Sequence, residues 1–216
     1  MLEKKKLIKL IEIFVLGFLF PISVVYFKLS SYILVLLWMI LVYVSIIYFT
    51  LYYKKHSWKN ITILGENTKY LLIILVRWIF FSLVLYGFTY YFFPDKLFII
   101  QKNDLNLLYK IFIFYPIFSA FPQEFIFCTF FFNRYKSLFK SNKTMVLMSS
   151  LVFCFSHIFA INWVAPFLGF FGGLIFARTY SKTNSLLLVS IEHALYGNTL
   201  FFLGLGWFFW GGSVNY

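Results

Sequence analysis

Residues 70–93 read YLLIILVRWIFFSLVLYGFTYYFF, an uninterrupted apolar stretch with one charged side chain, Arg77. At 1.5 Å rise per residue, about 20 helical residues cross the ~30 Å hydrocarbon core of a bilayer, so this stretch is long enough to span a membrane. The whole chain has the same character: 62% of its 216 residues are hydrophobic, 25% are aromatic and 12% are charged. Because a water-soluble domain cannot hide so much apolar surface, the composition predicts a polytopic membrane protein.

Further apolar runs on either side of this stretch predict an all-α transmembrane helical bundle of about seven helices, forming a single membrane domain over residues 1–216. Pro166 cannot continue a preceding helix without loss of a backbone hydrogen bond, so we expect a tight turn between the fifth and sixth helices. The first run precedes no small-residue cleavage site and is expected to be retained as a span. The runs cover approximately residues 8–27, 31–53, 70–93, 107–132, 145–161, 164–177 and 184–210.

Basic residues lie in short groups between the apolar runs, and their distribution predicts the orientation of the chain. If the helices alternate in direction, fourteen of the nineteen Lys and Arg residues fall on one side. The positive-inside rule assigns that side, and with it the N-terminus, to the cytoplasm. We therefore interpret the net charge of +12 as a topology signal, not as a nucleic-acid-binding surface. The fourteen residues are Lys4, Lys5, Lys6, Lys9, Lys54, Lys55, Lys59, Lys69, Arg134, Lys136, Lys140, Lys143, Arg178 and Lys182.

Glu124, His157 and His193 are ionisable side chains placed inside long apolar runs. Counted from the nearest cytoplasmic basic residue of each helix, they lie roughly 15, 21 and 16 Å deep, close to the middle of the bilayer. Charged side chains at that depth cost about 2.5 to 3.5 kcal/mol each on translocon scales, so they normally serve a function. Glu192, which precedes His193, points about 100° away on the helix and either orients another helix or interacts with His193.

A carboxylate and two imidazoles at one depth allow two kinds of chemistry. They can bind a divalent metal such as zinc, with Glu124, His157 and His193 as ligands. Alternatively, they can position a water, with the carboxylate as general base and the histidines stabilising an oxyanion, as amide hydrolysis requires. The structural alternative is that each side chain only joins helices through interhelical hydrogen bonds.

Three short motifs contain these residues: PQEFIFC at 122–128, FCFSH at 153–157 and HALYGN at 193–198. The first resembles the Glu-Glu-x-x-x-Arg motif of the CAAX prenyl protease and bacteriocin-processing (CPBP, also called Abi) family of intramembrane proteases. The second matches the Phe-x-x-x-His motif of that family, and the third resembles its His-x-x-x-Asn motif. The order of the motifs agrees with the family, and the resemblance covers roughly residues 110–210.

The resemblance implies that Glu124 and His157 activate a water for peptide hydrolysis, whereas His193 and Asn198 form an oxyanion site. It also implies a CPBP-like catalytic core over residues 106–210, preceded by N-terminal transmembrane helices over residues 1–105. Family substrates include prenylated C-terminal tails and small membrane-associated peptides, and zinc is one alternative cofactor. Together with the small size of the chain, the resemblance indicates a multi-pass protein of a bacterial inner (cytoplasmic) membrane.

The first motif departs from the family at two positions. Gln123 replaces the first glutamate, and an amide can form hydrogen bonds but cannot accept a proton as a base. Cys128 replaces the arginine, which removes a cation that would keep a glutamate ionised. We consider Arg77 a candidate replacement, because it lies about 12 Å deep, near the level of Glu124. The alternative is that Arg77 extends to the cytoplasmic interface.

The third motif departs in its spacing, because Asn198 follows His193 by five residues instead of four. In a regular helix the two side chains would then lie about 140° apart, and a π-bulge near Gly197 would be needed to restore a shared face. Without that bulge, Asn198 is only a polar residue of the bundle. Cys128 and Cys154 could join the histidines in a metal site, but burial as small hydrophobic residues is the simpler interpretation.

Three functions follow from these observations. The first is an intramembrane endopeptidase that cuts membrane-associated peptides or protein tails with a water activated by glutamate and histidine. The second is a catalytically inactive relative that binds membrane peptides, confers immunity or assembles with partner proteins, which Gln123 and Cys128 favour. The third, a small transporter or proton relay, is disfavoured because the sequence has no inverted repeat.

Overall fold

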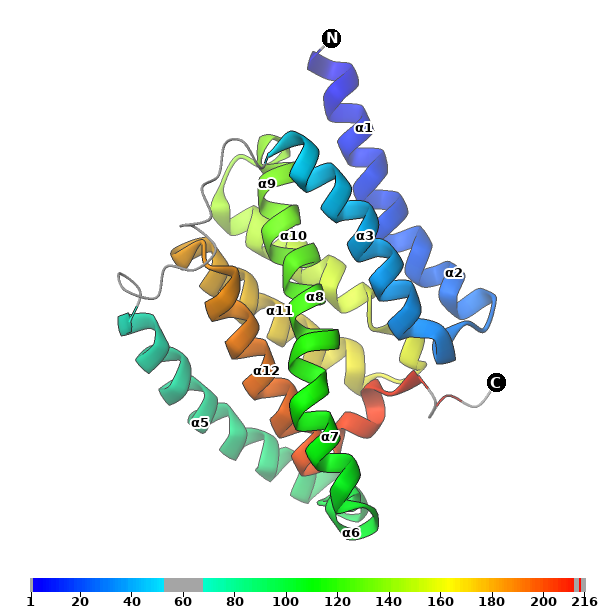
Figure 1. Ribbon diagram of the computed structural model, residues 1–216, viewed down its shortest axis with the longest axis vertical. Coiled ribbons are helices and arrows are strands. Elements are labelled where there is room, and N and C mark those ends of the chain that lie inside the picture. The colour runs from blue at the N-terminus through cyan, green and yellow to red at the C-terminus, as the bar shows by residue number, and fades with distance from the viewer. Residues whose placement is uncertain (1, 53–67, 212–213, 215–216) are drawn as a thin grey trace.

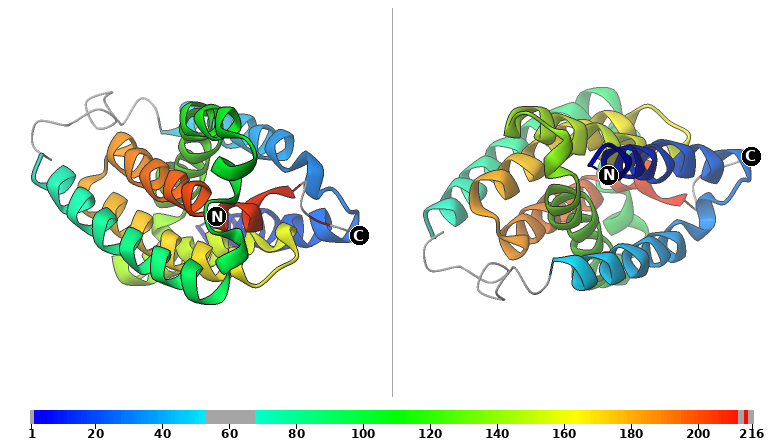
Figure 2. Two further views of the ribbon diagram at one scale, coloured as in Figure 1. Left: turned by 90° about the horizontal axis from the view of Figure 1, so that it is seen from below. Right: turned by 90° about the horizontal axis from the view of Figure 1, so that it is seen from above.

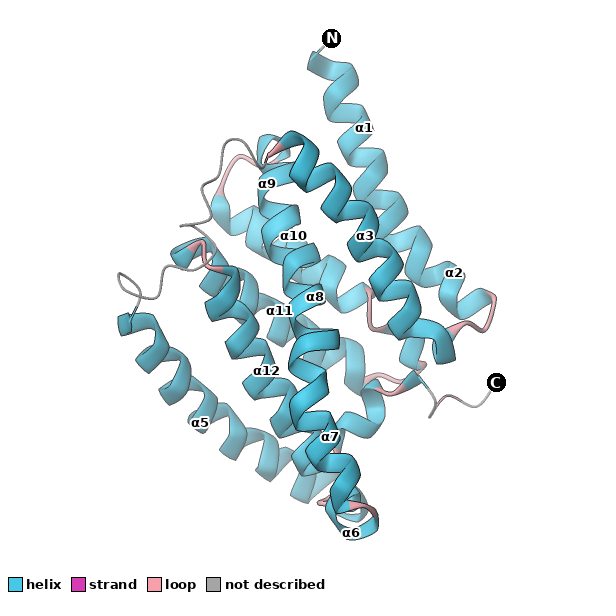
Figure 3. Cartoon of the chain, in the orientation of Figure 1, coloured by secondary structure: helices cyan, strands magenta, loops and turns pink. Residues whose placement is uncertain are grey.

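The computed structural model describes residues 2–52, 68–211 and 214, and these residues are almost entirely helical, with no strand among them (Figures 1 and 3). The predicted all-α polytopic bundle is confirmed. Lys54, Lys55 and Lys59, which we assigned to the cytoplasmic side, lie outside the described residues.

Six helical segments of the described chain are long and apolar enough to cross a membrane. A seventh helix, α11 (Val164–Thr183), lies between the last two of them, at the place of the predicted run 164–177. Successive segments run in opposite directions along the bundle, as Figure 1 shows. The six segments are Glu3–Tyr26, Ser30–Leu51, Lys69–Phe92, Leu105–Leu138, Asn142–Ala160 and Leu186–Leu203.

Two of these segments are composite. The first joins α1 (Leu2–Phe14) to α2 (Phe20–Tyr26) through a π-helical turn at Val15–Leu19. The fourth joins α7 (Leu105–Tyr115), α8 (Phe121–Glu124) and α9 (Phe131–Tyr135) through π-helical turns at 116–120 and 125–130. The remaining long helices are α3 (Ile33–Leu51), α5 (Thr68–Phe92), α10 (Asn142–Phe155) and α12 (Leu186–Leu203), with a short α6 (Ile99–Asn103) before α7.

Small residues allow α11 to pack closely on α10. A Cβ atom added to Gly173 would lie 3.0 Å from the Ser150 backbone, and one added to Gly169 would lie 3.2 Å from Nδ1 of His157. Ala165 and Ala177, on the same helix, are buried. Close approach of helix backbones through small residues is a common way for membrane helices to associate, since lipid offers no hydrophobic drive for it.

Two helices end earlier than the apolar runs that contain them. α10 ends at Phe155, and a 3₁₀ turn at Ile158–Ala160 leads into α11, which confirms the tight turn before Pro166. α12 ends at Leu203 because Gly204 adopts φ = +90°, a conformation that favours glycine and stops the helix. The apolar residues that follow form a 3₁₀ turn at Leu205–Phe209 instead of continuing the helix.

The end-on views in Figure 2 show α1 and α2 at one edge of the bundle and α5 at the other. α12 contacts α5, α7, α8 and α11, so it occupies the interior of the bundle. In contrast, α3 and α5 expose many large apolar side chains, such as Met39, Ile46, Leu72 and Leu83, which suits helices that face lipid. The motif residues therefore lie on the inner helices.

Candidate active site

Glu124 and His193 form a buried pair that joins α8 to α12. The Nδ1–H group of His193 donates a hydrogen bond to Oε1 of Glu124 over 2.7 Å, and the two residues are 5% and 1% exposed. The second carboxylate oxygen, Oε2, is buried without a hydrogen-bond partner among the described residues. The thiol of Cys128 lies beside this carboxylate. The Glu124 carboxylate thus binds the His193 imidazole and lies beside the Cys128 thiol. This weakly polar thiol stands where the family motif has an arginine.

Tyr115, at the end of α7, forms a hydrogen bond with the other ring nitrogen of His193. Its hydroxyl oxygen lies 2.9 Å from Nε2 of His193. Because Nδ1 donates to the Glu124 carboxylate, a neutral His193 has its lone pair on Nε2, and the Tyr115 hydroxyl donates to it. The His193 ring also stacks on Phe176, with ring centroids 4.5 Å apart and an interplanar angle of 16°. Glu124, His193 and Tyr115 therefore form a continuous hydrogen-bonded chain held in one orientation.

Gly197 makes the Tyr115 contact sterically feasible. A Cβ atom at position 197 would overlap the Tyr115 ring and hydroxyl, so only glycine lets the tyrosine lie against α12 here. The helix stays regular from Leu186 to Leu203. The π-bulge that we considered at Gly197 is therefore absent, because the glycine admits a side chain from α7 instead of an extra helical residue.

Asn198 points toward α7. Its Nδ2 donates to the Phe112 carbonyl at 3.4 Å, and it is not among the cavity-lining residues described below. Pro116 explains this contact, since it has no N–H group to donate to the carbonyl four residues earlier. An oxyanion role for Asn198 thus remains a prediction, whereas the observed contact is that of a polar bundle residue.

Pro122, six residues after Pro116 and next to the candidate site, likewise leaves a backbone carbonyl without its N–H donor. The carbonyl four residues before it, that of Phe118, accepts a hydrogen bond from Trp38 Nε1 at 3.0 Å. In the π-helical turn that follows, Ser149 Oγ donates to the Phe127 carbonyl at 2.7 Å. These side chains from α3 and α10 satisfy carbonyl groups of an irregular helix whose shape places Glu124 opposite His193.

His157 lies in the turn after α10, and its hydrogen bonds fix its tautomer. A carbonyl oxygen can only accept, so the bond of 2.8 Å between Nδ1 and the Phe153 carbonyl places the proton on Nδ1. The other ring nitrogen, Nε2, has no hydrogen-bond partner in the described part of the chain. His157 therefore presents a free lone pair, which a general base requires.

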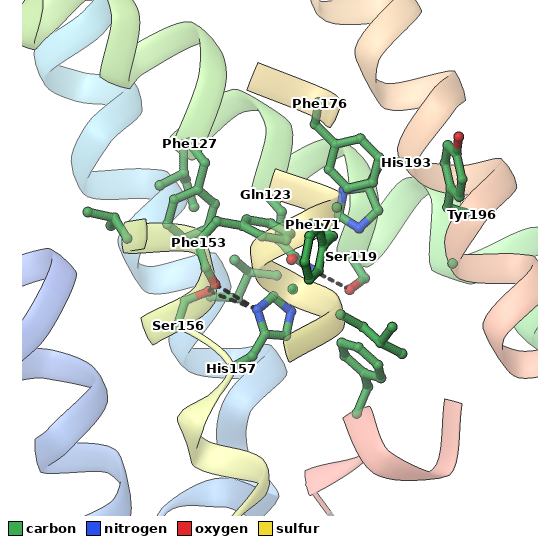
Figure 4. Close-up of a pocket in the computed structure, with 18 of the residues that line it drawn as sticks. Ser119, Gln123, Phe127, Phe153, Ser156, His157, Phe171, Phe176, His193 and Tyr196 are labelled. Carbon is green, nitrogen blue, oxygen red and sulfur yellow. Dashed lines mark hydrogen bonds between the residues drawn. The ribbon is translucent and has the colours of Figure 1, made fainter. Parts of the chain in front are cut away.

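A cavity of about 600 Å³ lies between the helices, and most of its lining is apolar. Gln123 contributes to the lining and donates from Nε2 to Ser119 Oγ at 2.9 Å, whereas Glu124 is not among the lining residues. Figure 4 shows Gln123, Ser119 and His157 pointing into the same part of the cavity. Of the two adjacent residues Gln123 and Glu124, only Gln123 therefore lines the cavity. Its polar lining residues are Tyr115, Ser119, Gln123, Tyr135, Ser156, His157, His193 and Tyr196.

The three ionisable residues singled out in the sequence meet only in part. Glu124 contacts His193, but the Phe153 ring lies next to both histidines, with centroids 4.7 Å from His157 and 5.6 Å from His193. The described residues, Cys128 and Cys154 among them, contain no group of three or more His, Cys, Asp or Glu side chains placed to hold a metal ion. The predicted zinc ligands thus do not fit a metal in this arrangement.

Arg77 has a different partner from the one we considered. Its guanidinium forms an ion pair with Glu192 and donates to Thr179 Oγ1 at 2.8 Å, so it does not take the place of the missing arginine beside Glu124. Glu192 is fully buried, pairs with Arg77 of α5 and is not among the cavity-lining residues. This pair joins α5 to α11 and α12, which gives Glu192 the helix-orienting role.

Tyr115, Ser119 and Ser156 belong to the polar part of the cavity but were not selected from the sequence. Tyr115 is one of 16 tyrosines in a chain rich in aromatic residues, and both serines lie in apolar runs where hydroxyl groups commonly bond to the backbone. Its position could have selected Tyr115 as a site residue, because it directly precedes Pro116 and lies nine residues before Glu124 in the same segment.

Comparisons with known proteins agree with the motifs. Residues 105–199 match the family model of Rce1-like proteins, described as type II CAAX prenyl endopeptidase Rce1-like. No curated protein and no solved structure matches the chain. The matched region begins with α7 and ends within α12, so it contains Tyr115, Gln123, Glu124, His157 and His193. Over residues 105–199, this multi-pass membrane protein is therefore similar to Rce1-like proteins of the CPBP family.

Proposed function

We propose that this protein is an intramembrane endopeptidase that hydrolyses a peptide bond of a membrane-associated peptide or protein tail inside the cavity. The observation that carries the proposal is His157, whose Nε2 is free and whose ring lines an apolar cavity of about 600 Å³. An apolar cavity with a few convergent polar groups is typical of a binding site for a hydrophobic ligand. The Rce1-like match supports a peptide that carries a prenyl group.

In this proposal His157 is the general base. Nε2 removes a proton from a water while the water oxygen bonds to the peptide carbonyl carbon, and the carbonyl π electrons move to the oxygen. The imidazolium then returns the proton to the departing amide nitrogen as the C–N bond breaks. Gln123 positions the water through its amide, because it lines the cavity beside His157. No step requires a metal.

Glu124 acts through His193 in this scheme. Its carboxylate is outside the cavity lining and holds Nδ1 of His193, which fixes the imidazole orientation and tautomer. This differs from the direct role in water activation that the family resemblance implies for Glu124. We also propose that the N-terminus faces the cytoplasm of a bacterial cell, on the basis of the distribution of basic residues.

One observation favours a second function. The polar residue of the first motif that lines the cavity is Gln123, and an amide cannot serve as a base. A protein with this site could bind a peptide in the cavity and release it uncut, as an immunity or partner-assembly protein would. Both functions use the same cavity and differ only in whether His157 suffices for hydrolysis.

The test is a cleavage assay in nanodiscs with a fluorescence-quenched peptide that ends in an S-farnesylated Cys-aliphatic-aliphatic-Met tail. The wild type is compared with His157→Ala, Glu124→Ala and, as a control, Cys154→Ser, which lies near the end of α10, three residues before His157, but outside the cavity lining. We expect cleavage by the wild type and control, and a loss of about 100-fold or more in His157→Ala. Cleavage that continues unchanged in His157→Ala contradicts the proposed site. Saturable binding of the peptide without cleavage supports the second function.

A further inference from the structure

Tyr115 is the residue of this site whose role the family motifs do not cover. It sits at the junction of α7 and the π-helical turn that begins at Pro116, and its side chain lines the cavity. The hydroxyl bonds to Nε2 of His193, and the ring packs edge-on against Phe201, with centroids 5.3 Å apart. A partly buried tyrosine that is fixed at both its ring and its hydroxyl can direct that hydroxyl at a bound ligand.

The Tyr115 side chain fills the space next to His193 and Gly197 on α12. Gly197 lies four residues after His193, so it shares the cavity-facing side of α12, and both residues line the cavity. A side chain at position 197 would start where the Tyr115 hydroxyl and the adjacent ring carbons now lie. Asn198, one residue further on, turns instead to the Phe112 carbonyl. The Tyr115 hydroxyl therefore occupies the place next to His193 that a polar side chain on α12 would otherwise take.

We infer that the Tyr115 hydroxyl is the oxyanion donor of this site, a role that rests on the proposed peptidase function. In the resting site it donates to Nε2 of His193. When a peptide is bound, the hydroxyl hydrogen turns to its carbonyl oxygen, and this hydrogen bond strengthens as water adds and negative charge develops on that oxygen. No proton is transferred by Tyr115: the proton of the water goes to Nε2 of His157, and the electron pair of the carbonyl remains on the stabilised oxygen.

The Glu124–His193 pair prepares this donor. Since Glu124 holds Nδ1 of His193 at 2.7 Å, the ring cannot rotate away, and Nε2 keeps the Tyr115 oxygen at 2.9 Å. Stacking on Phe176 restrains the same ring from its face. A donor that is oriented before the reaction stabilises developing charge without reorganisation at the moment of attack, which is why such donors contribute strongly to catalysis.

Kinetics of five variants test the inference in the same cleavage assay. Tyr115→Phe, which removes only the oxygen, should lower kcat about 100-fold with little change in KM, because loss of one oxyanion donor costs on the order of 10²–10³ in kcat. Gly197→Asn should also be impaired, because its side chain overlaps Tyr115. Tyr115→Ala/Gly197→Asn should recover at least about tenfold relative to Tyr115→Ala, because an amide then occupies the vacated place. Tyr109→Phe, on the lipid-facing side of α7, is the control.

An unchanged kcat in Tyr115→Phe overturns the inference, and so does a loss that appears only in KM. A second measurement separates this failure from failure of the proposed function. The farnesylated peptide, labelled with ¹³C at the carbonyl of the prenylated cysteine, is bound to His157→Ala, and its carbonyl stretch is recorded by infrared difference spectroscopy. A shift to lower frequency that disappears in His157→Ala/Tyr115→Phe supports Tyr115 as the donor even where the wild type cuts nothing. A frequency that is identical in both variants overturns the inference even where the wild type cleaves.

Discussion

The carboxylate of Glu124 accepts a hydrogen bond from Nδ1 of His193 at 2.7 Å; His193 lines the cavity, whereas Glu124 does not. Glu124, the buried acid that the sequence predicts as the base, therefore orients the imidazole of His193. The residue beside it, Gln123, is the one that enters the cavity. Among the polar residues that line the cavity, we assign direct roles toward a substrate to His157, Gln123 and Tyr115.

Replacing Gln123 with glutamate should raise the rate of peptide cleavage. The substitution nearly preserves shape and puts a carboxylate in the cavity beside His157, where a correctly placed base contributes typically 10²–10⁴-fold. We expect a gain of at least about tenfold in kcat, measured with the quenched peptide. Ser119→Ala, which removes the hydrogen-bond partner of Gln123 without adding a base, is the matched comparison. A decrease in Gln123→Glu would indicate that the amide itself is needed to hold the water.

Asn198→Ala should destabilise the protein without slowing cleavage by the folded fraction. The Asn198 amide satisfies the Phe112 carbonyl that Pro116 leaves without a donor, and loss of such a bond typically costs about 1 kcal/mol. Thermal unfolding in detergent measures the stability, and active-site titration corrects the rate. Trp38→Phe should behave in the same way, because it removes the donor to the Phe118 carbonyl. A fall of about 100-fold in kcat for Asn198→Ala alone would restore the oxyanion role implied by the family resemblance.

Arg77 and Glu192 should show strong coupling in a double-mutant cycle. Removing one partner leaves an unpaired charge in the bundle, and breaking a buried pair costs about 3–5 kcal/mol. We expect Arg77→Met and Glu192→Leu each to be severely destabilised, and the double variant to recover most of the loss because no charge remains unpaired. Unfolding of the three variants in detergent gives the coupling energy. Additive effects would show that the pair does not hold α5 in place.

Chelators should leave peptide cleavage unchanged. Glu124 and His193 are bound to each other, the Phe153 ring lies next to both histidines, and the described residues offer no set of three metal ligands. Dialysis against 1,10-phenanthroline followed by the cleavage assay tests this expectation, with metal content measured on the same sample. Loss of activity that returns on addition of Zn²⁺ would mean that the predicted ligands rearrange around a metal.

Much of the fold was accessible from the sequence because lipid imposes simple rules. A helix must satisfy all its backbone groups internally, so apolar runs of spanning length predict the bundle. The turn before Pro166 was predicted from a missing N–H group. The end of α12 was not, because the apolar residues continue beyond Gly204 and only the backbone conformation of that glycine stops the helix. The π-helical turns around Glu124 were also missed, since they depend on donors from other helices.

The sequence by itself determined that the chain spans a membrane several times, and it predicted that Glu124, His157 and His193 lie at mid-depth, in the order of a known family. Hydropathy and spacing along one helix are local properties, and they suffice for these conclusions. Only the tertiary structure decided which groups meet: Arg77 with Glu192, Asn198 with the Phe112 carbonyl, and Tyr115 with His193 over Gly197. Such contacts depend on the rotation and approach of separate helices, which are set by packing and not by the position of any residue along its own helix.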